Sequence, residues 1–526
     1  MKILVSDSIS QKGIEILKKA GFEVDIKIGL KPEELKEIIG EYDALIIRSA
    51  TKVTADIIEK AKKLKVIGRA GTGVDNVDNI AATKKGIVVM NTPGGNTITT
   101  AEHTIALMFS LARRIPQASV SLKEGKWERK KFIGVELYNK TLGIIGLGRI
   151  GTEVAKRAQS IGMNVLAYDP FLSDERAEEL GVVKTDFERV LRESDFITIH
   201  TPLTSETKNM INKETISKMK DGVYIINCAR GGIVNEKDLY EAIESGKVAG
   251  AAVDVFEKEP PDPSNPLILS EKVICTPHLG ASTLEAQENV AVAIAEQVVD
   301  YLINGTIRNA VNFPSIPFDQ VPLIRPYLVL LERMGSFASQ IFGKSIRQIQ
   351  IEYLGEVSTL NTQALTAAAV KGVLDPILDK SVNYVNAPIM TKERGIEVKE
   401  IKGKDAGDYQ SLVKIMLLSK DDKISISGTL LSKRDPRIVQ IDDIPLEIIP
   451  EGNMIFMKNW DRPGVIGNIG TLLGQNNINI GHMHFGRKEA GGIAFSVISV
   501  DTPLTEEIVE KIKKLPNVLE VKPVYI

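Results

Sequence analysis

Short runs of apolar, often β-branched residues alternate with amphipathic helical stretches from residue 1 to about residue 285. This alternation predicts βαβ units, whose strands lie parallel in one sheet. The strand-like runs are apolar throughout, as expected where helices cover both faces of a sheet. They are K-I-L-V-S, D-A-L-I-I-R, K-V-I-G-R-A, G-I-V-V-M, T-L-G-I-I-G, N-V-L-A-Y-D, F-I-T-I-H, Y-I-I-N-C and A-A-V-D-V-F. The pattern therefore predicts an α/β fold with two doubly wound, Rossmann-like domains that divide near residue 98.

The pattern changes in the second half of the chain. An Ala/Val-rich helical stretch at 283–304 ends at Asn304-Gly305, and the prolines of N-A-V-N-F-P-S-I-P predict a linker near residue 315. Residues 318–450 mix a helical segment with strand-like runs, which predicts an α+β domain, and no chemical constellation stands out there. Residues 453–526 follow the ferredoxin-like order β-α-β-β-α-β. We expect four domains, which comprise residues 1–97 with 287–315, 98–286, 318–450 and 453–526.

Composition excludes several classes of protein. The chain has 526 residues, of which 43% are hydrophobic and 25% are charged, as in ordinary globular proteins. Its 66 basic and 68 acidic residues nearly cancel, so it lacks the field that a nucleic-acid or membrane-surface binder needs. No run approaches the roughly 20 apolar residues of a membrane span, and the N-terminus lacks a signal-peptide core. Cys228 and Cys275 are too few for a disulfide framework, so we expect two buried thiols, no metal site and a soluble cytoplasmic protein.

A glycine-rich segment, T-L-G-I-I-G-L-G-R-I-G, connects a predicted strand to a predicted helix. Gly146, Gly148 and Gly151 have the G-x-G-x-x-G spacing that lets backbone N–H groups approach a pyrophosphate. The motif alone also occurs in ordinary turns. Asp169 ends the next predicted strand, close to the spacing of about 20 residues at which a carboxylate binds the adenosine ribose. Because no Arg or Lys follows in Pro170-Phe171-Leu172, the sequence predicts NAD instead of NADP.

Three polar residues follow predicted strands, where α/β sheets bind their ligands. Arg230 follows Y-I-I-N-C-A, Glu259 follows A-A-V-D-V-F-E-K, and His278 follows V-I-C-T-P. Histidine suits proton transfer near neutral pH, a carboxylate can orient its ring, and arginine can hold a substrate carboxylate bidentately. Each residue alone also has a structural explanation, as a packed strand-end histidine, a surface cation or a loop charge. Their coincidence after a dinucleotide motif favours oxidation of a hydroxy acid.

Six segments of the chain resemble D-isomer-specific 2-hydroxyacid dehydrogenases. They are G-R-A-G-T-G-V-D-N (68–76), G-L-G-R-I-G (146–151), H-T-P-L (200–203), N-C-A-R-G-G-I-V (227–234), D-V-F-E-K-E-P (254–260) and P-H-L-G-A-S-T (277–283). Within the family, the chain resembles the long members, which carry an intervening domain and an amino-acid-binding ACT domain after the catalytic core. The resemblance implies NAD-dependent oxidation of 3-phospho-D-glycerate to 3-phosphohydroxypyruvate, the first step of L-serine biosynthesis.

The resemblance also assigns roles to residues. It implies that Arg230, Glu259 and His278 are the catalytic group. Besides the three glycines, it places the following residues in the NAD site: Thr72, Arg149, Ile150, Asp169, Thr201, Cys228, Ala229, Arg230, Asp254, His278 and Gly280. His103 and His200 match no position of proton transfer, and we expect both to be structural.

A phosphorylated substrate needs further cations. Arg48 and Arg69 each end a predicted strand of the first domain, and together with Arg230 they predict a substrate site with a phosphate clamp. Each could instead be a solvated charge. The family places the segment with Arg129 to Lys131 near a neighbouring subunit's active site, so we expect a homodimer or homotetramer. The alternatives are a relative that reduces glyoxylate or hydroxypyruvate, and a NAD-sensing regulatory protein, which would need no proton relay.

The C-terminal segments N-W-D-R-P-G-V-I-G-N-I-G-T-L-L and N-N-I-N-I resemble the ligand-binding loop and helix of ACT domains. The resemblance implies L-serine as a feedback inhibitor, with Asp461 on its ammonium group, Asn459 nearby and Asn479 reaching over from a partner chain. This chain has Asn459 and Asp461 where some serine-regulated members have a His-x-Asn pair. The affinity for serine and the identity of the ligand therefore stay open.

Overall fold

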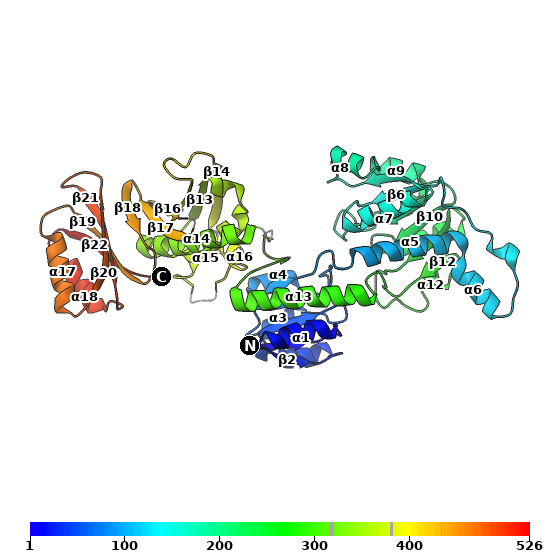
Figure 1. Cartoon of the computed structure of the whole chain (residues 1–526), viewed down its shortest axis with the longest axis horizontal. Coiled ribbons are helices and arrows are strands. Elements are labelled where there is room, and N and C mark those ends of the chain that lie inside the picture. The colour runs from blue at the N-terminus through cyan, green and yellow to red at the C-terminus, as the bar shows by residue number, and fades with distance from the viewer. Residues whose placement is uncertain (315–319, 379–381, 433) are drawn as a thin grey trace.

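The computed structural model describes residues 1–314, 320–378, 382–432 and 434–526. The described residues form four β-sheets, each with its own helices, arranged as an elongated molecule (Figure 1). Among these residues, no helix combines the length and the apolar character that crossing a membrane requires. The α/β class expected from the sequence is confirmed, and the two N-terminal sheets are wholly parallel.

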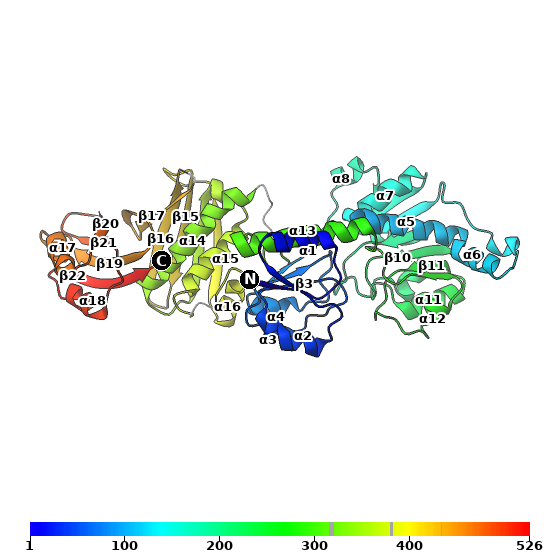
Figure 2. The same cartoon turned by 60° about the horizontal axis from the view of Figure 1, so that its bottom comes forward.

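The first sheet has five parallel strands in the order β2-β1-β3-β4-β5. Its strands are β1 (Lys2–Val5), β2 (Glu23–Ile26), β3 (Ala44–Ile47), β4 (Val66–Arg69) and β5 (Val88–Met90). Its helices are α1 (Gln11–Lys19), α2 (Pro32–Ile38), α3 (Ala55–Lys60) and α4 (Asn79–Lys84). The long helix α13 (Leu284–Asn304) returns from far along the chain to pack on α1 and β4 (Figure 2). The sequence did not predict strand β2, because this strand lies at the sheet edge, is only partly buried and has no apolar run.

The second sheet has seven parallel strands in the order β12-β11-β10-β9-β6-β7-β8. Its strands are β6 (Thr141–Ile145), β7 (Asn164–Tyr168), β8 (Val183–Lys184), β9 (Phe196–Ile199), β10 (Val223–Asn227), β11 (Val248–Val253) and β12 (Val273–Cys275). Its helices are α5 (Thr97–Arg113), α6 (Ile115–Lys123), α7 (Arg149–Ser160), α8 (Asp174–Glu179), α9 (Phe187–Glu193), α10 (Lys213–Ser217), α11 (Glu236–Glu244) and α12 (Pro266–Leu269). The strand order reverses between β6 and β9, and such a reversal opens a ligand crevice at the carboxyl ends of the strands.

The third sheet has the order β14-β13-β15-β16-β17-β18, in which only the β13–β14 pair is parallel. Its strands are β13 (Gln348–Gly355), β14 (Glu397–Gly403), β15 (Ser411–Leu418), β16 (Lys423–Leu431), β17 (Asp435–Ile441) and β18 (Ile444–Ile448). Its helices are α14 (Val321–Phe342), α15 (Thr362–Leu374) and α16 (Ala387–Glu393). Helices α14 and α15 pack together, and α14 lies against the sheet. The expected mixture of helix and strand is confirmed.

The fourth sheet has the order β20-β21-β19-β22. Its elements are β19 (Asn453–Trp460), α17 (Val465–Gln475), β20 (Ile480–Arg487), β21 (Ile493–Val500), α18 (Glu506–Lys513) and β22 (Val518–Tyr525), which is the β-α-β-β-α-β succession expected. Helices α17 and α18 share one core with the sheet. A second core joins the sheet to α14, where the rings of Phe337 and Phe456 meet edge to face at 6.4 Å. The C-terminal unit is thus tied to the preceding one by a shared hydrophobic core.

Candidate functional site

The glycine-rich loop joins β6 to α7, and each of its three glycines meets a different steric demand. Gly146 has a φ of 92°, and a Cβ there would lie 2.7 Å from the carbonyl oxygen of His200. A Cβ on Gly151 would lie 2.2 Å from the carbonyl oxygen of Gly146. A Cβ on Gly148 would meet nothing within 4 Å. The loop therefore turns sharply, packs helix against strand, and leaves open space before the first N–H groups of α7, where a pyrophosphate fits.

Asp169 follows β7 and lies beside this loop. Its carboxylate accepts hydrogen bonds from the N–H of Leu147 at 2.9 Å and from that of Phe171 at 2.8 Å. The hydroxyl of Thr201 is buried and has no hydrogen-bond partner among the described residues. These donors and acceptors fit a dinucleotide, because the Asp169 carboxylate can bind the ribose, the Thr201 hydroxyl is unused, and the N-terminus of α7 is open.

Other residues expected at the cofactor surround the same crevice. Arg149 and Ile150 begin α7. The Arg149 guanidinium lies near Gly94, which belongs to the segment between β5 and α5. The Thr72 hydroxyl donates to the side chain of Asn96 at 2.8 Å, which ties the loop after β4 to the start of α5. Both lie where the two parallel-sheet units meet.

The two cysteines differ in burial. Cys228 is buried next to Ala229 at the end of β10, and burial raises the pKa of its thiol to about 12. Cys275 is only half-buried, and burial raises its pKa to about 11. The expectation of two buried cysteines is therefore wrong for Cys275, because β12 is the edge strand of its sheet.

His278 and Glu259 form a hydrogen-bonded pair. The Nδ1 atom of His278 lies 2.8 Å from Oε2 of Glu259, and Oε1 of Glu259 accepts the N–H of Phe256 at 3.1 Å. Burial by itself raises the pKa of Glu259, but the hydrogen bond and charge of His278 and the Phe256 N–H outweigh it, so the pKa lies below its ordinary value. Because Glu259 occupies Nδ1, the other ring nitrogen, Nε2, is the one that can exchange a proton with a ligand.

Asp254 holds the loop that carries His278. Its fully buried carboxylate accepts the Thr276 hydroxyl at 2.6 Å, the Leu279 N–H at 2.7 Å and the Gly280 N–H at 2.9 Å. Nε2 of His103 lies 3.2 Å from the same carboxylate. Burial raises the pKa of Asp254, but these hydrogen bonds and His103 bring it below its ordinary value. Asp254 therefore fixes the 276–280 loop in shape.

His200 lies beneath the glycine-rich loop, and its Nδ1 atom is buried without a hydrogen-bond partner among the described residues. Its Nε2 lies 3.0 Å from the hydroxyl of Thr198, and burial lowers its pKa to about 4. A neutral buried imidazole with this partner agrees with a structural role. His103, bonded to Asp254, also lies outside the His278–Glu259 pair.

Three arginines that follow or end three different strands lie close to one another. Nε of Arg230 donates to Asp75 at 3.0 Å, and its Nη1 donates to the Ala229 carbonyl at 2.7 Å. Burial and, after it, the charges of Arg230 and Arg48 together lower the pKa of Arg69 to about 10. Nε of Arg69 is buried without a hydrogen-bond partner among the described residues. The structure thus places all three guanidinium groups in one electrostatic cluster.

Arg230 links the cluster to the edge of the second sheet that carries the catalytic pair. Strands β10, β11 and β12 are neighbours, and they lead into Arg230, Glu259 and His278 respectively. A Cβ on Gly231 would lie 1.9 Å from the carbonyl oxygen of Phe256, so the backbone after Arg230 touches the segment that binds Glu259.

Two carboxylates of the cluster were missed in the sequence. Asp7 lies two residues after β1 and accepts the backbone N–H of Arg48 at 2.6 Å, and Asp75 binds Arg230. Asp7 could have been found by the rule that located the other site residues, because it lies just beyond the carboxyl end of a strand of a parallel sheet. Asp75 lies inside the G-R-A-G-T-G-V-D-N segment but has no strand-end position to mark it.

The residues expected to bind an effector do not meet within one chain. Asn459 is buried and accepts the Ser496 hydroxyl, while Asp461 accepts Arg487 at 2.5 Å and the Gly491 N–H at 3.1 Å. Asn479 is bonded to Asp501. The register pairs Asn459 with Ala494 but places Asn479 beside the Val500 end of the same sheet, which separates them by about 20 Å.

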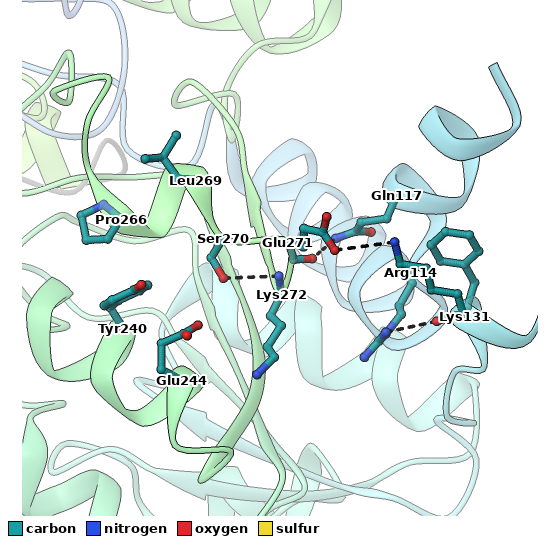
Figure 3. A pocket seen from close by; sticks show the side chains of 11 residues that line it. Arg114, Gln117, Lys131, Tyr240, Glu244, Pro266, Leu269, Ser270, Glu271 and Lys272 are labelled. Atoms are coloured by element: carbon teal, nitrogen blue, oxygen red, sulfur yellow. Dashed lines mark hydrogen bonds and ion pairs between the residues drawn. The ribbon is translucent and has the colours of Figure 1, made fainter. Parts of the chain in front are cut away.

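A separate cavity of about 430 Å³ lies between the start of α6 and helices α11 and α12. Arg114, Gln117 and Lys131 line one wall, and Tyr240, Glu244 and Pro266 line the other (Figure 3). Neither the His278–Glu259 pair nor the arginine cluster lines it. It is therefore distinct from the candidate active site.

Comparison with known proteins covers every part of this architecture. Residues 105–280 match the NAD binding domain of D-isomer specific 2-hydroxyacid dehydrogenases, residues 323–442 match the D-3-phosphoglycerate dehydrogenase intervening domain, and residues 454–517 match the ACT domain. The chain is 49% identical over 522 residues to the D-3-phosphoglycerate dehydrogenase of Archaeoglobus fulgidus, with 99% of each chain covered. It is 44% identical to that of Bacillus subtilis, again with 99% of each covered.

Solved structures agree with the catalytic part. A D-lactate dehydrogenase from Aquifex aeolicus, complexed with NAD and lactic acid, is 30% identical with a TM-score of 0.53, over 60% of this chain and 100% of that one. An NAD-dependent formate dehydrogenase from Staphylococcus aureus, in complex with NAD, is 30% identical with a TM-score of 0.54, over 59% and 98%. The chain therefore belongs to the D-3-phosphoglycerate dehydrogenases, within the D-isomer-specific 2-hydroxyacid dehydrogenase family.

Proposed function

We propose that the protein catalyses the NAD-dependent oxidation of 3-phospho-D-glycerate to 3-phosphohydroxypyruvate, the first step of L-serine biosynthesis. The observation that carries this proposal is the three-arginine cluster, whose Arg230 follows a strand at the sheet edge that also carries the His278–Glu259 pair and the dinucleotide loop. A 2-hydroxy acid needs a base for its hydroxyl and a cation for its carboxylate, and a phosphate dianion needs further cations.

The protein's own groups divide the chemistry between them. Nε2 of His278 accepts the hydroxyl proton of the substrate, and Glu259 stabilises the imidazolium that results. Arg230 holds the substrate carboxylate, which orients C2 toward the crevice of the glycine-rich loop. NAD, when bound there, supplies the hydride acceptor. In the reverse direction His278 returns the proton to the oxygen of the keto acid.

Arg48 and Arg69 receive the phosphate in this proposal. Two other guanidinium groups oppose the charge of Arg69, and its Nε has no hydrogen-bond partner in the described part of the chain, so an incoming dianion would meet unsatisfied donors. A dehydrogenase for glyoxylate or hydroxypyruvate would not need this arrangement. A NAD sensor would not need the His278–Glu259 pair.

A substrate panel tests the proposal. NADH formation is followed with 3-phosphoglycerate, glycerate, lactate and 2-hydroxyglutarate at equal concentrations. The expected result is a strong preference for 3-phosphoglycerate. Equal use of glycerate would show that Arg48 and Arg69 do not bind a phosphate.

For the domain organisation we propose units of residues 1–97 with 287–315, 98–286, 318–450 and 453–526. In support, helix α13 packs on α1 and β4 of the first sheet, although it follows the last strand of the second. The free thiols of Cys228 and Cys275 agree with a reducing cytoplasmic location.

We also propose a homodimer or homotetramer that uses the arm formed by residues 114–138. The arm exposes a row of large apolar side chains, a pattern typical of an interaction surface. These are Ile115, Val120, Leu122, Trp127, Ile133 and Tyr138. Arg129 to Lys131 lie on the same arm and would reach a neighbour's active site. Analytical ultracentrifugation of Trp127→Glu should show dissociation, and an unchanged mass would exclude the arm as the interface.

L-serine is the effector that we propose for the ACT domain. Because Asn459 and Asn479 lie at opposite ends of one sheet, a site that uses both requires two chains. Asp461 is engaged with Arg487, so the serine ammonium group would have to replace that partner. Calorimetry should show serine binding to the wild type and none to Asp461→Ala, with unchanged basal activity in the variant. A wild type that binds no serine would leave this domain without an assigned effector.

A further inference from the structure

Asp75 lies against the arginine that binds the substrate carboxylate, and no step of the chemistry above uses it. It belongs to the loop between β4 and α4, and its Oδ2 accepts Nε of Arg230 at 3.0 Å across 155 positions of the chain. The Asp75 side chain is 71% exposed, whereas that of Arg230 is 32% exposed. The pair therefore joins the two parallel-sheet units at the place where the substrate must enter.

The loop is shaped to receive these guanidinium groups. A Cβ on Gly73 would lie 2.1 Å from Nη2 of Arg230, and one on Gly71 would lie 1.8 Å from Nη1 of Arg69. The loop backbone therefore lies directly against the two cations, and a side chain at either position would require the guanidinium group to move. Oδ2 of Asp75 is 3.0 Å from the same Gly73 Cβ position, so the contact with Arg230 follows from the path of the loop.

Two carboxylates face the arginine cluster, and they differ in freedom. Asp7 is almost fully buried and accepts three hydrogen bonds, from the N–H of Arg48 and from the N–H and hydroxyl of Thr51. Asp75 is largely exposed, and its bond to Arg230 leaves it open to water. Both raise the pKa of Arg69, against the influence of burial and of the other arginines. Asp7 is thus a fixed part of the site, and Asp75 is the carboxylate that can leave.

We propose that Asp75 is a resident counter-ion, which occupies Arg230 in the empty site and is displaced by the carboxylate of the substrate. Nε of Arg230 donates to Asp75 and Nη1 donates to the Ala229 carbonyl, so a carboxylate that binds bidentately at the Nε and Nη2 edge takes the place of Asp75. This inference rests on the proposed function, because it takes Arg230 as the carboxylate partner of a 2-hydroxy acid.

The charge of the substrate also requires Asp75 to leave the cluster. Three guanidinium groups face Asp7 and Asp75, which leaves the empty cluster with little net positive charge. The substrate brings a carboxylate and a phosphate of about −2. An Asp75 that stayed in place would repel both groups, whereas one that turns into water leaves the cluster free to bind them. Asp75 therefore weakens the binding of every anion at Arg230 and keeps the guanidinium paired until a substrate arrives.

Neutralising Asp75 tests this directly. Exposed ion pairs change an equilibrium constant by up to roughly five-fold, and the lost repulsion acts in the same direction. Asp75→Asn should lower the KM and the calorimetric Kd of 3-phosphoglycerate by about three- to ten-fold, with kcat changed less than about two-fold. The decrease should shrink in high salt, because the effect is electrostatic and exposed. Asp75→Ala should behave in the same way.

The matched control is Asp56→Asn, which removes an equally exposed carboxylate from α3 of the same unit, where it pairs with Lys36. It should leave KM and Kd unchanged. Retained NADH binding, followed by fluorescence, verifies that each variant is folded. An unchanged or raised KM in either Asp75 variant would overturn the inference and make Asp75 a residue that merely positions Arg230. Failure of the wild type and of Asp56→Asn to use 3-phosphoglycerate would instead overturn the proposed function.

Discussion

Nδ1 of His278 lies 2.8 Å from Oε2 of Glu259, and the two residues follow neighbouring strands of the second sheet. His278 has a φ of 55°, a left-handed conformation that is held by the hydrogen bonds of the 276–280 loop to Asp254. The ring is therefore fixed from two sides, by a carboxylate on one nitrogen and by the loop backbone. Such fixing presents Nε2 to a ligand in one orientation.

Removal of the imidazole should abolish proton transfer and spare the cofactor site. We expect His278→Ala to lower kcat by about 10²–10⁴-fold, the usual contribution of a positioned acid or base. NADH binding, measured by fluorescence, should stay nearly unchanged because the glycine-rich loop is untouched. His482→Ala, which removes an exposed histidine from the C-terminal sheet, is the control. Near-normal turnover of the His278 variant would make that residue structural.

Asp254 should make stability depend on pH. Its pKa is lower in the folded protein than the ordinary value of 3.8, so its stabilising contribution is complete above that value and is lost as the pH falls through the folded pKa. Asp254→Asn presents an amide to buried donors and should cost about 1–3 kcal/mol at pH 7. Thermal unfolding of both proteins from pH 7 to pH 3 checks this. A gap that stays constant below pH 4 would show that Asp254 is not ionised in the fold.

Asp169 should set the choice of cofactor. Replacement by Ser keeps an acceptor for the ribose but removes the charge that repels a 2′-phosphate. We expect the ratio of kcat/KM for NAD over NADP to fall by roughly ten-fold or more, the effect of one charge-assisted hydrogen bond. Steady-state kinetics with both cofactors measures the ratio. The same ratio in variant and wild type would place the ribose elsewhere.

Gly148 and Gly151 offer a matched pair of substitutions in one loop. A Cβ on Gly151 would collide with the Gly146 carbonyl at 2.2 Å, so Gly151→Ala should lower both thermal stability and NADH binding. A Cβ on Gly148 meets only open space, so Gly148→Ala should keep the stability of the wild type while it weakens NADH binding. Thermal unfolding and NADH fluorescence separate the two effects. Normal NADH affinity in Gly148→Ala would mean that the pyrophosphate does not approach this glycine.

Much of the catalytic unit was predictable from local sequence. Apolar runs and amphipathic stretches determine strands and helices over a few residues, because side-chain periodicity is a local property. The position of Arg230 and His278 after strands then followed from the geometry of parallel sheets, which gather strand ends at one edge. The C-terminal β-α-β-β-α-β order was predictable for the same reason.

Tertiary structure decided what links distant parts of the chain. The edge strands β2 and β8 are short and largely exposed, so their sequences contain no apolar run. They form because they pair with a neighbouring strand. The contact of Asp75 with Arg230 depends on how two sheets are joined, since 155 positions separate the residues. The separation of Asn459 from Asn479 depends on strand register. The local sequence pattern determines which residues form each helix and strand. The packing of buried surfaces determines which elements contact one another, and contacts such as that of Asp75 with Arg230 set the charge of the substrate site.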